Sequence, residues 1–298
     1  MRSWLLVALG ALVLLGCQPA RQALPGADDV GKPVADKGGF LYEITPNTEG
    51  AAPFYLFGVI HYDKLFAAEE FHLMLKPSAW QRILGADRTF VELAAPYSRP
   101  GVQAAEPRQT AQPDADLKRV SQKGAGELQP LYADCGFSMV GADVQTAWVV
   151  QKSGKRIHGL ETPEDRQRIF GQMSDQDREK SASFQQLSSA QHNAAALLVA
   201  ARAAGKDTEC RAIEESWLAW KTENVAAVEA QLAAEASNDP VFTRYGIDER
   251  SALFHERINR HLKEKGSMFF ALGALHLYGE RGLLALFKAD GYTVSWLP

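Results

Sequence analysis

Cysteine is scarce in this sequence, with three among 298 residues, and no two of them form a Cys-x-x-Cys pair. This removes the usual zinc-ribbon and thioredoxin-type redox motifs. A Gly-Lys-Ser/Thr phosphate loop, a Gly-x-Ser-x-Gly nucleophile elbow and a His-Glu-x-x-His helix are absent as well. The sequence therefore lacks the common local signatures of nucleotide hydrolases, serine α/β-hydrolases and helix-based zinc proteases.

Neither sign of charge dominates the chain, whose formal net charge is −4 and whose pI is about 6.0. Without a long basic run it carries no electrostatic footprint for nucleic acid, so we expect no nucleic-acid partner. Hydrophobic residues make up 46% of the sequence. This is enough for one large core or two smaller ones.

An uncharged apolar run, Trp4 to Gly16, follows Arg2 at the N-terminus. It is too short to span a bilayer comfortably and is typical of a signal-peptide core. It ends in Leu-Leu-Gly-Cys17, which resembles a bacterial lipobox. Residues 1–17 are therefore predicted to be a lipoprotein signal peptide with Cys17 lipidated, and an ordinary secretory signal is the alternative. Gln18, which is not Asp, favours the outer membrane, with the protein facing the periplasm.

Residues 18–38 are rich in Gly, Pro, Ala, Asp and Lys without periodicity, and this composition predicts a flexible tether. Residues 39–298 then form the folded domain. An exported protein folds in an oxidising space, where Cys135 and Cys210 are the only remaining pair. A disulfide and two buried free thiols both stay open, because sequence does not fix the distance between them.

The folded part begins and ends in strand-like runs, and helix-like segments dominate its middle. The runs at 39–44 and 53–61 predict a hairpin, and those at 88–93, 155–162, 267–277 and 292–298 predict further strands. Predicted helices cover 67–75, 78–87, 141–154, 162–173, 174–204, 212–236, 248–266 and 279–291. The sequence predicts one α/β domain whose terminal strands lie side by side in a mixed sheet with flanking helices.

Two apolar runs end in the same way. Gly58-Val59-Ile60-His61 closes one run, and Gly273-Ala274-Leu275-His276 closes another near the opposite end of the chain. Ligand sites in open α/β sheets lie beyond strand ends, and a glycine there lets backbone or ligand approach closely. We therefore expect the two histidines to share a site, with two unrelated core histidines as the alternative.

A carboxylate at a third strand end completes this set. Glu92 lies at the end of the strand-like run Arg88 to Leu93, one residue before its last. Two imidazoles and one carboxylate leave open positions on a divalent ion, whose bound water then becomes a nucleophile near neutral pH. His61, Glu92 and His276 are therefore the predicted metal ligands, and Mn, Co or Zn is the predicted ion. Tyr62 and Asp63 are candidates for orienting the His61 imidazole.

Several of these stretches resemble the TraB/PrgY/GumN family, which includes the Tiki metalloproteases. The most specific stretch is "GALHLYGERGLLALFKADGYTV", and "LFGVIH", "FVEL", "HGLETPEDRQ" and "DERSALFHERI" also match. The resemblance places the family's acidic residues at Glu92 and Glu161 and its helix arginine at Arg250. The sequence departs from the family at Val59, where Thr is common, and at Ser251, where Asn is usual.

The resemblance implies a mixed α/β fold related to erythromycin-esterase-like and haem-binding ChaN-like proteins, and a metal-dependent peptidase site in some members. Glu161 and Arg250 become candidates to assist, as a further ligand or base and as a partner of a carboxylate. The first functional hypothesis is a metal-dependent hydrolase that cleaves a peptide or protein at the cell envelope. A non-catalytic envelope lipoprotein that binds a metal or haem, and a scaffold with a vestigial site, are the alternatives.

Overall fold

The computed structural model describes residues 38–48, 51–64, 75–93, 135–138, 141–181 and 210–297 of the chain. The predicted signal peptide with Cys17 and nearly all of the tether lie outside these residues, as do residues 67–74 of the helix expected at 67–75 and residues 182–204 of the helix expected at 174–204. Within them, no helix is long and apolar enough to cross a membrane.

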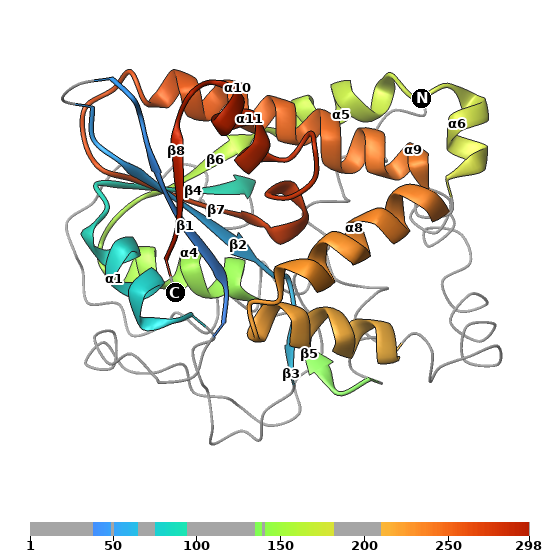
Figure 1. Ribbon diagram of the computed structural model, residues 1–298, viewed down its shortest axis with the longest axis horizontal. Helices are drawn as coiled ribbons and strands as arrows, with labels where there is room; N and C mark the ends of the chain where they lie inside the picture. The colour runs from blue at the N-terminus through green and yellow to red at the C-terminus, as the bar shows by residue number, and fades with distance from the viewer. Residues whose placement is uncertain are drawn as a thin grey trace.

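A six-stranded mixed sheet forms the centre of the molecule (Figure 1), in the order β6-β4-β7-β2-β1-β8. The strands are β1 (Phe40–Thr45), β2 (Phe54–Val59), β4 (Arg88–Leu93), β6 (Ile157–Glu161), β7 (Met268–Gly273) and β8 (Thr293–Leu297). The neighbours β6, β4, β7 and β2 are parallel, whereas β1 is antiparallel to β2 and β8. The predicted hairpin, the mixed sheet and the pairing of the terminal strands are confirmed.

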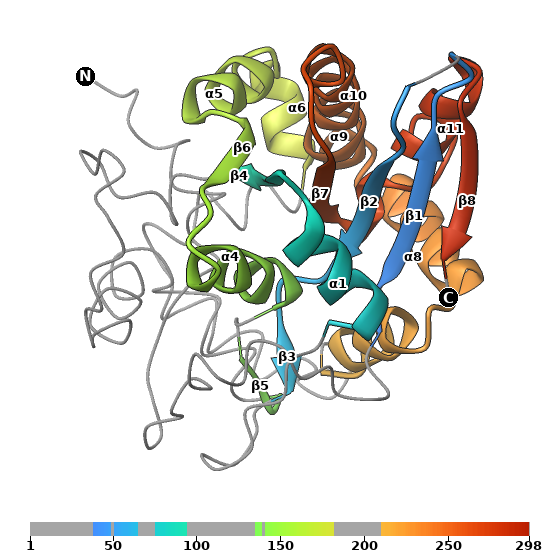
Figure 2. The same ribbon diagram turned by 90° about the vertical axis from the view of Figure 1, so that its left-hand side faces the viewer.

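The central strands are apolar along almost their whole length because both faces of the sheet are covered. All six residues of β7 are buried, as a parallel strand between two helical layers requires. Helices α1 (Pro77–Gly85) and α4 (Ala142–Lys152) cover one face, and α10 (Glu249–His261) and α11 (Leu283–Ala289) cover the other (Figure 2). The sheet therefore sits in the middle of an α/β/α sandwich.

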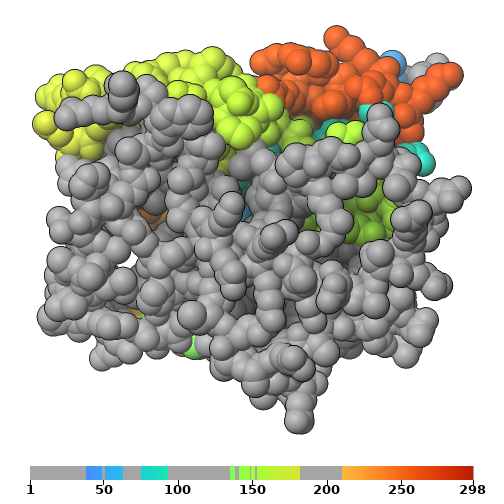
Figure 3. Space-filling view, turned by 180° about the vertical axis from the view of Figure 1, so that it is seen from behind, coloured from blue at the N-terminus to red at the C-terminus, as the bar shows by residue number. Residues whose placement is uncertain are grey.

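The other helices of the described ranges lie beyond one end of the sheet. They are α5 (Pro163–Gly171), α6 (Asp175–Lys180), α8 (Val225–Asn238) and α9 (Pro240–Phe242), with a helical stretch at 210–221. In Figure 3, the surfaces of α5, α6 and α10 form the upper edge of the molecule. A second, two-stranded sheet pairs β3 (Asp63–Lys64) with β5 (Phe137–Ser138). The Cys135–Cys210 disulfide is present, with 5.1 Å between the Cα atoms.

Three predicted elements differ from expectation. The helix predicted at 174–204 is interrupted at Ser181, which adopts an extended conformation after α6 ends at Lys180. The helix predicted at 212–236 is broken at Glu223, whose φ of 53° is left-handed, and α8 restarts behind the Asn224 cap. Strand β7 stops at Gly273, and the next three residues form a 3-10 turn, η4 (Ala274–His276), so His276 stands on a turn and not in the strand.

Candidate functional site

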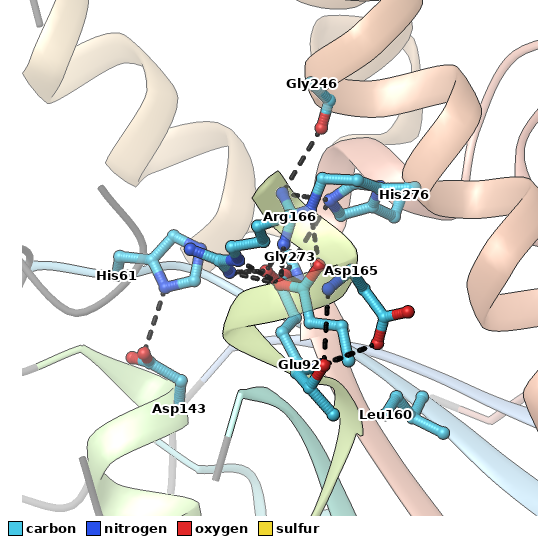
Figure 4. Close-up of polar contacts among 12 residues, drawn as sticks. His61, Glu92, Asp143, Leu160, Asp165, Arg166, Gly246, Gly273 and His276 are labelled. Carbon is cyan, nitrogen blue, oxygen red and sulfur yellow. Dashed lines mark hydrogen bonds and ion pairs between the residues drawn. The ribbon is translucent and has the colours of Figure 1, made fainter. Parts of the chain in front are cut away.

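The carboxyl ends of the four parallel strands meet at one edge of the sheet, and the predicted site residues gather there (Figure 4). His61 follows β2, Glu92 lies in β4, Glu161 is the last residue of β6, and His276 lies in the turn after β7. Arg250 reaches them from α10. Parallel strands place their carboxyl ends side by side, which is why residues far apart in sequence converge.

Gly273 marks the point of convergence. A Cβ atom on this glycine would lie 2.9 Å from Glu92 Oε1, 3.4 Å from His61 Nε2 and 3.5 Å from His276 Cδ2. The glycine is required here for space, and its amide donates to Glu92 Oε1 over 2.7 Å. The expectation that the two histidines come together is confirmed, because an atom of each ring lies within 3.5 Å of this one position.

The His61 imidazole is oriented by a carboxylate that lies 82 residues further along the chain. Its Nδ1 lies 3.0 Å from Asp143 Oδ2, near the start of α4. Burial alone would lower the pKa of His61, but Asp143 outweighs it and raises the pKa to about 9. The contact leaves Nε2 facing Gly273 and Glu92, and the His61 side chain keeps 40% of its surface exposed.

The surroundings of the His276 imidazole lower its pKa, in contrast to those of His61. Ser251 Oγ donates to the Ile247 carbonyl over 2.7 Å and lies 2.9 Å from His276 Nδ1. Since the hydroxyl proton is used on Ile247, the oxygen accepts from Nδ1–H, which leaves the lone pair on Nε2. Burial, with some help from Arg250, lowers the pKa of His276 to about 4. His276 is therefore a neutral ring with a fixed tautomer.

Glu92 and Glu161 are held by two guanidinium groups. Glu161 is fully buried and accepts from both Nε and Nη2 of Arg250 and from Arg166 Nε. Arg250 Nη2 also bonds Glu92 Oε2, and Arg166 Nη2 lies 3.6 Å from the same oxygen. Burial alone would raise the pKa of Glu92, but Arg250 above all holds it well below its ordinary value.

The second terminal nitrogen of Arg250 is held by the π-helical segment before α10. Arg250 Nη1 donates to the Gly246 carbonyl, in the π-helical segment η3 (Thr243–Asp248), and approaches His276 Nε2, both over 3.2 Å. Burial opposes the charge on Arg250, but Glu161 and Glu92 overcome it and raise its pKa. Arg250 thus links both carboxylates to the neutral imidazole.

The side chains of His61, Glu92 and His276 are of the types that bind divalent ions. In this structure their nitrogen and oxygen atoms contact other protein groups. Two imidazole nitrogens and a carboxylate are ligands that Zn, Mn and Co accept, and each has an orienting partner. Across the described ranges, no three His, Cys, Asp or Glu side chains are grouped as a ready metal site. Arg250 lies 3.2 Å from His276 Nε2 and donates to one oxygen of Glu92.

Sequence reasoning missed Asp143 and Arg166. Both stand near helix starts, on α4 and α5, and acidic or basic residues there are commonly surface charges, so no local pattern distinguishes them. Of the suggested partners of His61, the Tyr62 hydroxyl bonds the Ile213 carbonyl instead, and the Asp63 side chain lies outside the described residues. Ser251, which stands where Asn is usual in the family, contacts His276 Nδ1 through its hydroxyl group.

Comparison with known proteins yields one match. The model of the TraB/PrgY/gumN family matches residues 128–295, a range that contains Glu161, Arg250 and His276. His61 and Glu92 precede the matched range. Neither the curated proteins nor the solved structures contain a match.

Proposed function

Because this chain belongs to the TraB/PrgY/gumN family, we propose that its site is a metal-dependent hydrolytic centre acting on peptide bonds at the bacterial cell envelope. The observation that carries the proposal is the convergence of His61 Nε2, Glu92 Oε1 and the His276 ring around Gly273. A glycine at the end of a strand lies beside two imidazoles whose pKa values are shifted in opposite directions. Core packing alone does not require this arrangement.

The ion would be held by Nε2 of His61, a Glu92 oxygen and Nε2 of His276. When bound, it would supply a water whose pKa falls towards neutrality and a Lewis acid for the scissile carbonyl. Mn, Co and Zn all accept this donor set. The proposed place of action is the periplasmic side of the outer membrane, reached through a lipid on Cys17.

The surrounding residues would act through orientation and charge. Asp143 holds the His61 ring so that Nε2 faces the site, and Ser251 holds the His276 tautomer with its lone pair on Nε2. Glu161 is saturated by two arginines, so its role is to fix Arg250 and not to serve as a base. Arg250 supplies a buried positive charge beside Glu92, where negative charge develops on a carbonyl under attack.

Turnover of a peptide library by the metal-loaded protein tests this proposal. His61→Ala and His276→Ala are each expected to abolish cleavage and to lower metal affinity at least ~10-fold while the fold persists. Glu92→Gln should weaken both properties, because it keeps the shape and removes the charge. His158→Ala is the matched control: this histidine is on the same sheet, with its ring centre 5.1 Å from that of Phe90, and its loss should change neither.

A metal- or haem-binding lipoprotein without turnover is the second candidate. The observation that favours it is the pairing of Glu92 and Glu161 with Arg250 and Arg166, which leaves neither of these two carboxylates ready to act as a base. Wild-type protein that binds an ion but cleaves no peptide with Mn, Co or Zn would favour this candidate. If Glu92→Gln kept full metal content and turnover, Glu92 would be structural.

A further inference from the structure

His61 stands on a segment that the main sheet does not hold. Strand β2 ends at Val59, and the chain then leaves the sheet through Ile60, His61 and Tyr62 before the short strand β3. The His276 turn, in contrast, follows a fully buried strand directly. The position of the His61 imidazole therefore depends on contacts from outside the six-stranded sheet.

One set of contacts to the His61 segment comes from the start of α4. The Ala142 amide donates to the Ile60 carbonyl over 2.8 Å, and Asp143 holds the His61 ring. Gly141 lies so close that a Cβ there would be 2.2 Å from the Ile60 oxygen. These contacts hold the backbone before His61 and the His61 ring against the start of α4.

A second set of contacts surrounds Tyr62. Its ring packs edge-on against Phe137 in β5, with 5.7 Å between the ring centres. Its hydroxyl donates to the Ile213 carbonyl, in the helical stretch 210–221, over 3.3 Å. The next two residues, Asp63 and Lys64, pair with β5 as a two-stranded sheet. Tyr62 is therefore wedged between β5 and the 210–221 helix.

The disulfide joins these two supports. Cys135 lies two residues before Phe137, and Cys210 lies three residues before Ile213. A two-stranded sheet with strands of two residues has little stability of its own, so the covalent link keeps β5 against the helix. Further along the same helix, Trp220 Nε1 donates to the carbonyl of Gly58, in β2, over 2.7 Å.

We propose that Tyr62 is a positioning residue for His61, and that the Cys135–Cys210 disulfide is a redox-sensitive staple that holds Tyr62 in place. Both cysteines are partly exposed, and access of a thiolate to one of the two sulfur atoms is what thiol–disulfide exchange requires. A reducing dithiol would transfer two electrons and two protons to the disulfide, giving two thiols while the dithiol becomes its own disulfide. The His61 segment would then loosen while the six-stranded sheet stays folded.

Hydrogen–deuterium exchange tests this without metal or substrate, so its outcome is independent of the proposed hydrolase function. On treatment with dithiothreitol, the Ala142 amide and the amides of residues 61–64 should exchange at least ~10-fold faster, with β7 amides unchanged. The Cys135→Ala/Cys210→Ala protein should behave in the same way. Rates that stay within ~2-fold, or β7 amides that accelerate equally, would overturn the proposal.

Two tyrosine variants keep the test valid if the cysteine variant does not fold. Tyr62→Ala in the oxidised protein should reproduce the fast exchange and make it insensitive to reductant. Tyr62→Phe keeps the ring on Phe137 and should remain near wild type. If Tyr62→Ala exchanges as slowly as wild type, Tyr62 does not position His61.

Discussion

The two histidines come from the same four-residue pattern, yet their surroundings separate their protonation states. Asp143 raises the pKa of His61 to about 9, whereas burial lowers the pKa of His276 to about 4. We expect NMR titration of the metal-free protein to show His61 charged and His276 neutral at pH 7. Asp143→Asn should bring the His61 pKa back towards its ordinary value, about 6.5, and leave His276 near 4.

The buried cluster of two carboxylates and two arginines is expected to contribute to the stability of the fold. The Glu161 side chain is 0% exposed and binds Arg166 and Arg250 together. Glu161→Gln leaves buried positive charge without its partner, which costs ~3 kcal/mol of unfolding free energy. Urea denaturation at pH 7 measures this.

An exposed pair provides the control for that measurement. Glu256 and Arg260 lie one helical turn apart on α10, and both side chains are more than 60% exposed. Glu256→Gln should therefore cost less than ~1 kcal/mol. If Glu161→Gln were equally mild, the buried cluster would not stabilise the fold, and a purely functional role for Glu161 would follow.

At the scale of elements, helix α5 is fixed to the site by its first turn. Thr162 and Asp165 form a capping box, and Arg257 of α10 pairs with Asp165 over 2.7 Å. Burial opposes the charge, but the hydrogen bonds from Thr162 and the Arg257 charge lower the pKa of Asp165. This helix carries Arg166, so the cap also places a guanidinium group of the site.

The sign of the pH effect follows from that lowered pKa. The Asp165 carboxylate contributes its full stability above the ordinary aspartate pKa of about 4, and the contribution is lost as the pH falls through the lower folded value. We expect Asp165→Asn to destabilise the protein by a constant amount between pH 5 and 8 and by less below pH 4. Thermal unfolding across this range measures it, and a difference that grows on acidification would contradict it.

The elements also show what the sequence could and could not predict. The apolar runs ending in His61, Glu92 and His276 predicted neighbouring strands correctly, because parallel strands buried on both faces need continuous apolar sequence. The Asp143–His61 contact was not predictable, since it joins helix and loop 82 residues apart. The break at Glu223 was missed because a left-handed glutamate has no distinct sequence signal.

At the scale of the whole molecule, charge and architecture act together. The site lies where four strands end, and Arg166 and Arg250 balance Glu92 and Glu161. Such balance permits four charged groups to share a largely buried edge that could not hold one alone. Strands β4 and β6 supply the two carboxylates, and helices α5 and α10 supply the two arginines.

Attachment of the whole protein to a membrane is the last prediction. Arg2, the apolar run from Trp4 and the Leu-Leu-Gly-Cys17 ending predict cleavage before Cys17 and its lipidation. A lipidated Cys17 would hold the protein at the membrane through its acyl chains, and two or more such chains anchor a protein stably. A serine at this position carries no lipid. Cys17→Ser should therefore move the protein from the membrane fraction to the soluble fraction. Cys135→Ser/Cys210→Ser, which removes the disulfide but not the anchor site, should stay with the membrane. A Cys17→Ser protein that fractionates like wild type would refute the lipid anchor and favour attachment by another part of the chain.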